Sequence, residues 1–245
     1  YSFLIKATDS NGDYVEQTIS GTVQAAGNAL PVAAATLHFA LSNNPDGIDL
    51  DGGGNLWVAG ASGNGLTKFV GFSSTVDFVV DATGDYRGVA YDPAGDDVYG
   101  AEFDDVKIRV YAAADGATGS NYNTLAAPRA VSIFDGKLMV CSATVLWVYT
   151  DLTTDTLLQT HTFTSLGLSA QNPAAMGGDG TNVMIGGDTG EAKIFTGASL
   201  LTATPVLLDT LAITDYEPSG FMHDGSNWYG CDRTTTDGIY IHANA

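Results

Sequence analysis

The chain is poor in positive charge. Its 245 residues include 9 Lys and Arg against 28 Asp and Glu, which gives a formal net charge of −19. A surface so acidic repels phosphate groups, so we expect no nucleic-acid partner. The sequence also lacks an apolar run of about 18 residues, which argues against insertion into a membrane.

The sequence also shows no helical periodicity over three turns. Instead, a short sequence motif recurs five times, each copy with a small residue in its third position, at Gly47, Gly88, Ala130, Ala175 and Gly220. These positions lie 41, 42, 45 and 45 residues apart. Runs of β-branched and aromatic residues, separated by turns with Asp and Gly, follow each copy. A repeat of about 40–45 residues built from short strands predicts a β-propeller with one four-stranded blade per repeat.

The fourth strand of each repeat sets the number of blades. Four repeats supply one, at 75–80, 121–125, 158–163 and 205–210, but the fifth repeat ends at Ala245 without one. A matching segment at 36–41 stands in front of the first repeat. We expect it to pair with the last blade and close the ring. The sequence thus predicts an all-β, five-bladed β-propeller at 36–245, closed by an N-terminal strand and preceded by a linker at 24–35.

The two cysteines and four histidines do not form a motif. Cys141 and Cys231 occupy the same small position of the second strand in two non-adjacent blades, so we expect two buried free thiols and no disulfide. The histidines are spread over different blades without a shared spacing, and we expect neutral side chains on the surface. They are His38, His161, His223 and His242.

The first 23 residues read as two strands around a polar turn. The segment Tyr1–Asp13 contains Ala7-Thr8-Asp9 followed by Gly12, and Tyr14–Val23 supplies the second strand. This pattern resembles the last hairpin of Ig-like and cadherin-like domains of bacterial and viral proteins. The resemblance implies that residues 1–23 are the C-terminal hairpin of an Ig-like domain.

The blades resemble those of NHL-repeat and gluconolactonase-type propellers, most clearly in Pro45–Asp51 and Gly54–Ala59. Members of the gluconolactonase group hold a metal in the central channel with Glu, Asn and Asp side chains. Here the corresponding positions, or their neighbours, are Asp49, Ala90, Ser132, Gly177 and Met222. One acid without a histidine does not make a metal site. We therefore predict no metal, no cofactor, no catalytic residue and no enzymatic activity.

Two arginines of this acidic chain are predicted to meet at one mouth of the ring. The residues directly before the small third position are Asp46, Arg87, Arg129, Ala174 and Ser219. Neighbouring loops add Tyr86, Tyr216, Glu217 and Arg233 to the candidate site. One interpretation is a shallow site for an anionic group, such as a sugar carboxylate gripped by paired guanidinium groups with aromatic stacking. The other is that Asp46 and Glu217 neutralise the arginines and fasten adjacent blades.

The leading functional hypothesis is a non-enzymatic structural or adhesion module of an extracellular assembly. Tandem Ig-like and propeller domains resemble those of phage structural proteins and bacterial surface proteins, which implies a phage tail or fibre located at the virion surface. The partners would be neighbouring structural subunits or a cell-surface glycan. A secreted lectin and a divergent lactonase-like hydrolase are the alternatives, although equivalent loops of the five repeats differ in length and chemistry.

Overall fold

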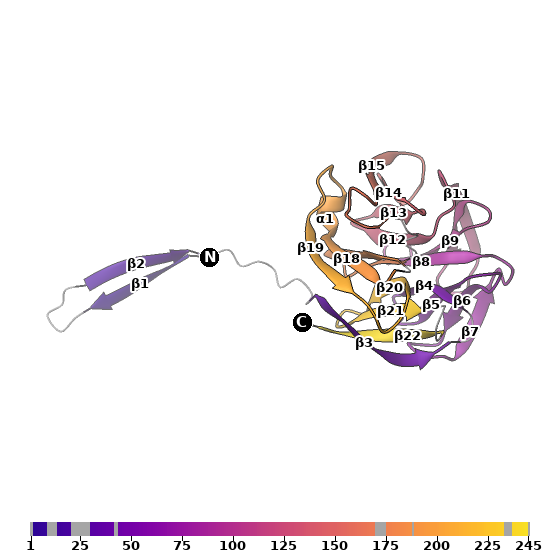
Figure 1. The fold of residues 1–245 in the computed structure, drawn as a ribbon, viewed down its shortest axis with the longest axis horizontal. Coiled ribbons are helices and arrows are strands. Elements are labelled where there is room, and N and C mark those ends of the chain that lie inside the picture. The colour runs from indigo at the N-terminus through magenta and orange to yellow at the C-terminus, as the bar shows by residue number, and fades with distance from the viewer. Residues whose placement is uncertain are drawn as a thin grey trace.

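The computed structural model describes residues 2–8, 14–20, 30–41, 44–169, 175–187, 189–232 and 237–244. Within these ranges, five four-stranded antiparallel sheets stand around a common centre, which confirms the predicted five-bladed propeller (Figure 1). Their first strands lie at the centre and their fourth strands at the rim. No helix of the described ranges is long and apolar enough to cross a bilayer.

Each blade runs outward from its first strand. Blade one is β4 (Pro45–Leu50), β5 (Leu56–Gly60), β6 (Gly65–Phe69) and β7 (Val76–Val80). Blade two is β8 (Tyr86–Asp92), β9 (Asp97–Glu102), β10 (Lys107–Ala112) and β11 (Thr118–Asn123). Blade three is β12 (Ala130–Phe134), β13 (Lys137–Cys141), β14 (Val145–Tyr149) and β15 (Leu157–Thr162). Blade four is β16 (Ala175–Gly178), β17 (Asn182–Gly186), β18 (Glu191–Thr196) and β19 (Leu207–Ala212), with the short helix α1 (Gly197–Leu200) between the last two.

The fifth blade is completed by the N-terminal part of the chain, as predicted. Its strands are β20 (Pro218–His223), β21 (Trp228–Asp232), β22 (Gly238–Asn244) and, as the outermost, β3 (Pro31–Ala40). The closing strand begins at Pro31, five residues before the predicted start at Thr36. Ahead of it, β1 (Ser2–Thr8) and β2 (Tyr14–Ser20) pair with each other as an antiparallel hairpin.

The recurring small residue has a steric cause. A Cβ atom on Gly47 would lie 2.6 Å from the Cα of Gly88, one on Gly88 would lie 2.8 Å from the Cα of Ala130, and one on Gly220 would lie 2.7 Å from the Cα of Gly47. Separations below 3.0 Å do not occur for real side chains. The first strands of neighbouring blades therefore touch backbone to backbone, and only small residues allow the ring to be this narrow.

Apolar side chains fill the spaces between the blades. One cluster joins blades three and four through residues such as Leu146, Phe163 and Leu200, all buried. Cys141 belongs to this cluster and Cys231 to the one between blades five and one. Both cysteines are buried and neither forms a disulfide, as expected. Burial raises the pKa of the Cys141 thiol well above its usual range.

The prediction of surface histidines was wrong for two of the four. His161 and His242 are buried, with 4% and 0% of their surface exposed. The Nε2 atom of His161 is hydrogen-bonded to the carbonyl oxygen of Leu200 at 2.9 Å, a contact that ties blade three to α1. A polar ring can be buried where each nitrogen meets a partner, and a single sequence does not reveal such partners.

Candidate functional site

The predicted mouth is built around a buried ion pair between blades one and two. Asp46, near the start of β4, is completely buried, and its Oδ2 atom lies 3.3 Å from Nη1 of Arg87 on β8. Asp85, just before β8, accepts hydrogen bonds from both Nε and Nη2 of Arg87 at 2.8 Å. Burial alone would lower the pKa of Arg87, but the bonds to Asp85 and the charge of Asp46 outweigh it and raise that pKa.

Arg129 reaches the same place from blade three. The guanidinium carbons of Arg87 and Arg129 lie 4.9 Å and 5.1 Å from the centre of the Phe103 ring, which belongs to the β9–β10 loop of blade two. Both contacts are within the range of cation–π attraction. The structure therefore brings the two predicted arginines together on one half-buried aromatic ring.

Ser219 is the remaining predicted mouth residue that the structure describes, and it also connects two blades. The Ser219 hydroxyl of β20 donates to the carbonyl oxygen of Pro45 at 2.6 Å, which joins blade five to blade one. Together with Asp46–Arg87 and the shared Phe103 ring, this gives a chain of contacts through blades five, one, two and three. We call the group Asp46, Asp85, Arg87, Phe103 and Arg129 the mouth cluster.

The two predicted tyrosines lie in the core. Tyr86 is completely buried and its hydroxyl is 2.5 Å from that of Tyr111. Tyr216 has 4% of its surface exposed and stacks on Tyr240 with ring centres 4.3 Å apart. Burial raises the pKa of both tyrosines well above the usual range. In these positions neither ring can stack on a ligand at the mouth.

The other predicted residues are not part of the mouth cluster. Glu217 is exposed and lines, with Asp215 and Thr189, a separate pocket of about 250 Å³. Arg233 lies outside the described residues, as does Ala174. Asp85 was missed by the sequence reasoning. The signal that could have found it is its spacing, because alternate residues of an extended segment point to the same side and Asp85 stands two before Arg87.

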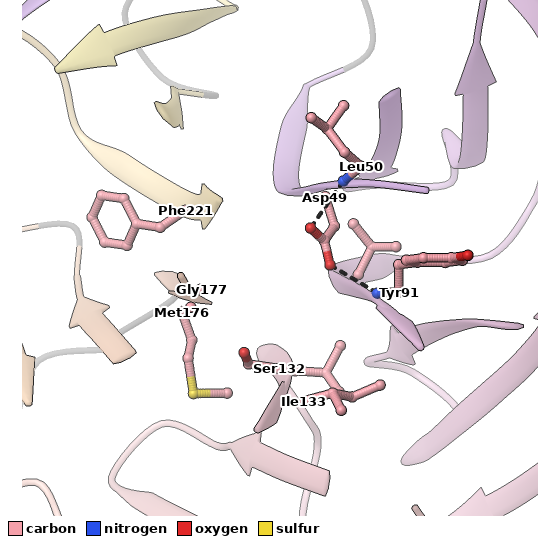
Figure 2. Close-up of a pocket in the computed structure, with 11 residues that line it drawn as sticks. Asp49, Leu50, Tyr91, Ser132, Ile133, Met176, Gly177 and Phe221 are labelled. Carbon is pink, nitrogen blue, oxygen red and sulfur yellow. Dashed lines mark hydrogen bonds between the residues drawn. The ribbon is translucent and has the colours of Figure 1, made fainter. Parts of the chain in front are cut away.

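A second polar feature occupies the central channel. A cavity of about 140 Å³ lies among the C-terminal halves of the inner strands and is bordered by Asp49, Ser132, Gly177 and their neighbours. Three of the five positions predicted to face the channel line this cavity, whereas Ala90 and Met222 belong to the apolar clusters between blades and are replaced in the lining by their neighbours. Figure 2 shows the side chains of Asp49 and Ser132 directed toward this open centre, and those of Met176 and Phe221 directed away from it.

Asp49 is the acid of this cavity. Its Oδ2 atom accepts the backbone N–H of Tyr91 at 2.8 Å, and its Oδ1 atom accepts that of Leu50 at 2.9 Å (Figure 2). Burial raises the pKa of the Asp49 carboxyl to about 6, although the two N–H groups partly oppose that rise. Asp49 thus joins the inner strands of blades one and two from the channel side.

The residues around Asp49 do not fit a divalent metal. Such an ion needs several oxygen or nitrogen ligands, typically six or more for calcium. Among the described residues, no group of three or more His, Cys, Asp and Glu side chains could hold a metal ion. Both oxygens of Asp49 already accept backbone N–H groups. The channel therefore does not reproduce the metal site that the gluconolactonase resemblance implies.

Comparisons with known proteins identify the fold. No family model matches the sequence, and no curated protein matches it. Among solved structures, the chain is similar to a glutaminyl cyclase from Myxococcus xanthus, with 11% identity and a TM-score of 0.64 over 88% of this chain and 97% of that one. It is also similar to hydrazine synthase from Kuenenia stuttgartiensis (12% identity, TM-score 0.52, 84% and 97% covered) and to the WD40 repeats of RRP9 (7% identity, TM-score 0.53, 89% and 100% covered). At such low identity these similarities establish the propeller fold alone.

Proposed function

We propose that this chain is a non-enzymatic adhesion module of an extracellular assembly, a phage tail or fibre, and that the mouth cluster contacts an acidic glycan of a cell surface. The observation that carries the proposal is the pair of guanidinium groups on the Phe103 ring. Guanidinium groups suit carboxylate recognition because their donors match its two oxygens. The half-buried Phe103 ring between them adds apolar surface that a sugar can contact.

The two arginines have different parts in this proposal. Arg87 is held by Asp46 and Asp85, and only 17% of its side chain is exposed. Its charge is largely matched by these two carboxylates, so it positions Phe103 and does not itself bind the ligand. Arg129 contacts the same ring from blade three and is half-buried. We propose that Arg129, whose guanidinium group lies on the Phe103 ring, contacts the sugar carboxylate and that Phe103 contacts the apolar side of the sugar.

The rest of the molecule supports a scaffold role. Inner strands in backbone contact and apolar cores between all neighbouring blades make a rigid ring, from which loops can vary without disturbing the fold. The channel offers one carboxyl group and, in the part of the chain that the structure describes, no cluster of metal ligands. These features favour contact over catalysis.

The first test is glycan binding. We expect the purified chain to bind sialylated or uronic-acid glycans on an array, and Arg129→Ala or Phe103→Ala to weaken that binding at least about tenfold, which corresponds to about 1.4 kcal/mol. Lys137→Ala is the control, because Lys137 pairs with Phe134 at the far end of the β12–β13 hairpin from Arg129. Circular dichroism and thermal unfolding of each variant check that the fold is kept.

Equal binding by the wild type, Arg129→Ala and Phe103→Ala would refute the mouth cluster as the ligand site. Absence of binding to all acidic glycans would refute the glycan itself. The assembly is tested independently by mass spectrometry of purified virions from the source culture, where the chain is expected among the structural proteins. Its absence from virions and presence in the soluble secreted fraction would favour the lectin alternative.

A further inference from the structure

A pocket of about 420 Å³ opens at the rim of the ring, between blades five and one. One wall is the end of the closing strand, at Ala40 and Leu41, and the other is formed by the outer strands β6 and β7 of blade one. Pockets that hold small molecules have volumes of about 300–1,000 Å³. We call this feature the rim pocket, and it shares no residue with the mouth cluster or the channel cavity.

One face of β6 is turned toward the rim pocket. Leu66 belongs to the apolar cluster between blades one and two, and the Nζ atom of Lys68 donates to the carbonyl oxygen of Ala113 in blade two. Side chains alternate across a strand, so Thr67 and Phe69 point the opposite way, toward blade five. Phe69 packs in the cluster between blades five and one, and both residues line the pocket.

Blade one has a small side chain where the other four blades have a large one. Thr67 pairs with Val58, the residue directly before the small position Ala59 of the second strand. The residues that pair at the corresponding place in blades two to five all have long or aromatic side chains. They are Arg109, Trp147, Lys193 and Tyr240.

The larger residues fill the space that the threonine leaves open. Trp147 lies in the apolar cluster between blades two and three, and Tyr240 lies in the cluster between blades four and five. The Cε atom of Lys193 would be 3.5 Å from a Cβ atom on Gly167, in the β15–β16 connection of blade three. These three side chains thus reach the preceding blade. The short side chain of Thr67 leaves the corresponding space as a pocket.

The lining of the rim pocket is uncharged, although the chain carries a net charge of −19. Among the described residues that line it, none is Asp, Glu, Lys or Arg. Val76 and Val79 line it with 52% and 46% of their surfaces exposed, and covering such apolar surface is favourable. An ionic ligand would find no opposite charge in this lining, so a neutral ligand is favoured.

Thr67 supplies an unused hydrogen-bonding group. Its exposed fraction is 4%, and its hydroxyl forms no hydrogen bond with any residue in the described part of the chain. The amide of Asn64, which also lines the pocket, already donates to the carbonyl oxygen of Ala61 at 2.7 Å. A hydroxyl both donates and accepts, and a buried one gains from any partner that a ligand brings.

The size of the rim pocket favours a small molecule over a protein partner. Stable protein interfaces bury on the order of 1,200 Å² or more. The lining here is confined to β6, β7, the loops beside them and the end of the closing strand. A second copy of this chain would also bring a further net charge of −19 to the rim, which opposes association.

We propose that the rim pocket binds a small neutral apolar molecule with one hydrogen-bonding group, which packs against Phe69, Val76 and Val79 and bonds to the hydroxyl of Thr67. The ligand thus occupies the space that a large side chain fills in the other blades. This inference goes beyond the proposed adhesion function and does not depend on glycan binding.

Fluorescence titration with N-phenyl-1-naphthylamine tests the rim pocket. This probe is neutral, has one N–H group and becomes strongly fluorescent in apolar surroundings. We expect the wild type to bind one molecule of it. Thr67→Tyr introduces the residue that blade five has at this position and should weaken binding at least about tenfold. Thr67→Val keeps the shape but removes the hydroxyl, and should weaken binding about fivefold.

Thr160→Tyr is the matched control, because Thr160 is an exposed residue of β15 in blade three and adds the same side chain outside the pocket. It should bind the probe as the wild type does. Val79→Asp is a second test that leaves the core intact, since Val79 is exposed on β7, and its carboxylate should abolish binding. Circular dichroism checks that each variant keeps the fold.

Three outcomes would overturn the proposal. They are the absence of probe binding to the wild type, equal binding by the wild type, Thr67→Tyr and Val79→Asp, and an equal loss in Thr160→Tyr. Equal binding by the wild type and Thr67→Val would refute the hydrogen bond to the Thr67 hydroxyl.

Discussion

Two junctions of the ring are held by different kinds of contact. The junction of blades one and two is charged. Arg87 lies between Asp46 and Asp85, and Lys68 pairs with Asp51 at 3.2 Å while donating to the carbonyl oxygen of Ala113 in blade two at 2.6 Å. At the closing junction of β22 and β3, the side-chain hydrogen bonds that the structure describes come from the His242 imidazole and the Asp215 carboxylate.

The difference shows how an acidic chain distributes its few cations. Buried carboxylates such as Asp46 and Asp51 need a positive partner, because an isolated charge in the interior is costly. The closing strand joins the ring without a buried charge pair among its described contacts, and backbone pairing provides most of its attachment. The charged junction should therefore be the more sensitive to removal of a single side chain.

The largest expected effect is at the charged junction. Asp46→Ala leaves the partly buried Arg87 with one carboxylate fewer and should lower the free energy of unfolding by about 3 kcal/mol. Urea unfolding monitored by tryptophan fluorescence measures it. Asp104→Ala is the control, because Asp104 is an exposed neighbour that raises the pKa of the same arginine. A similar loss in both variants would show that the general charge, and not the buried pair, holds this junction.

The second prediction concerns pH and separates two opposing contributions. The raised pKa of Asp49, about 6 against 3.8, means that the folded state binds more protons than the unfolded state between these values. Its contribution to stability therefore falls as the pH rises from about 4 to 6. His242, with its lowered pKa, contributes in the opposite direction just below 6.5.

Asp49→Asn should remove the first contribution and reveal the second. In urea unfolding between pH 4 and 7.5, we expect the variant to gain stability with rising pH more steeply than the wild type does. Adding His242→Asn to this variant should flatten part of the profile near pH 6, because His223, whose pKa is also lowered by burial, is still present. Identical pH profiles for the wild type and Asp49→Asn would contradict the assignment of a raised pKa to the channel carboxyl.

The fold was predictable because its main steric constraint, the close approach of the inner strands, requires a small residue that recurs once in each repeat of the sequence. Gly47, Gly88 and Gly220 recur where inner strands touch, and the unpaired segment near Thr36 identified the closing strand. The start of that strand was placed too late, since the bulge near Ala35 breaks the alternation that marks a strand.

The site was predictable only in part, because the sequence gives the order of residues and not the direction of each side chain. Arg87 and Arg129 were correctly placed near each other, but Tyr86 and Tyr216 were taken for mouth residues. Each of these tyrosines packs over a glycine of the second strand: a Cβ atom on Gly100 would lie 2.8 Å from the Tyr86 ring, and one on Gly230 would overlap Tyr216. A glycine inside an apolar strand is therefore a signal that an aromatic ring is buried over it, either of the same blade, as at Gly100 and Gly230, or of the next one, as with Phe221 over Gly186.

The smallest expected effect tests whether an exposed ion pair contributes to the free energy of unfolding. Lys107 pairs with Asp105 at 3.4 Å, and the two side chains are 34% and 47% exposed. Solvent screening at such a position weakens the attraction, so Lys107→Gln should change the free energy of unfolding by less than about 0.5 kcal/mol. The same urea experiment as for Asp46→Ala gives the value, at low and at moderate salt. A loss comparable to that of Asp46→Ala would mean that the ring depends on its net charge, and the distinction between a charged and a neutral junction would then have no energetic basis.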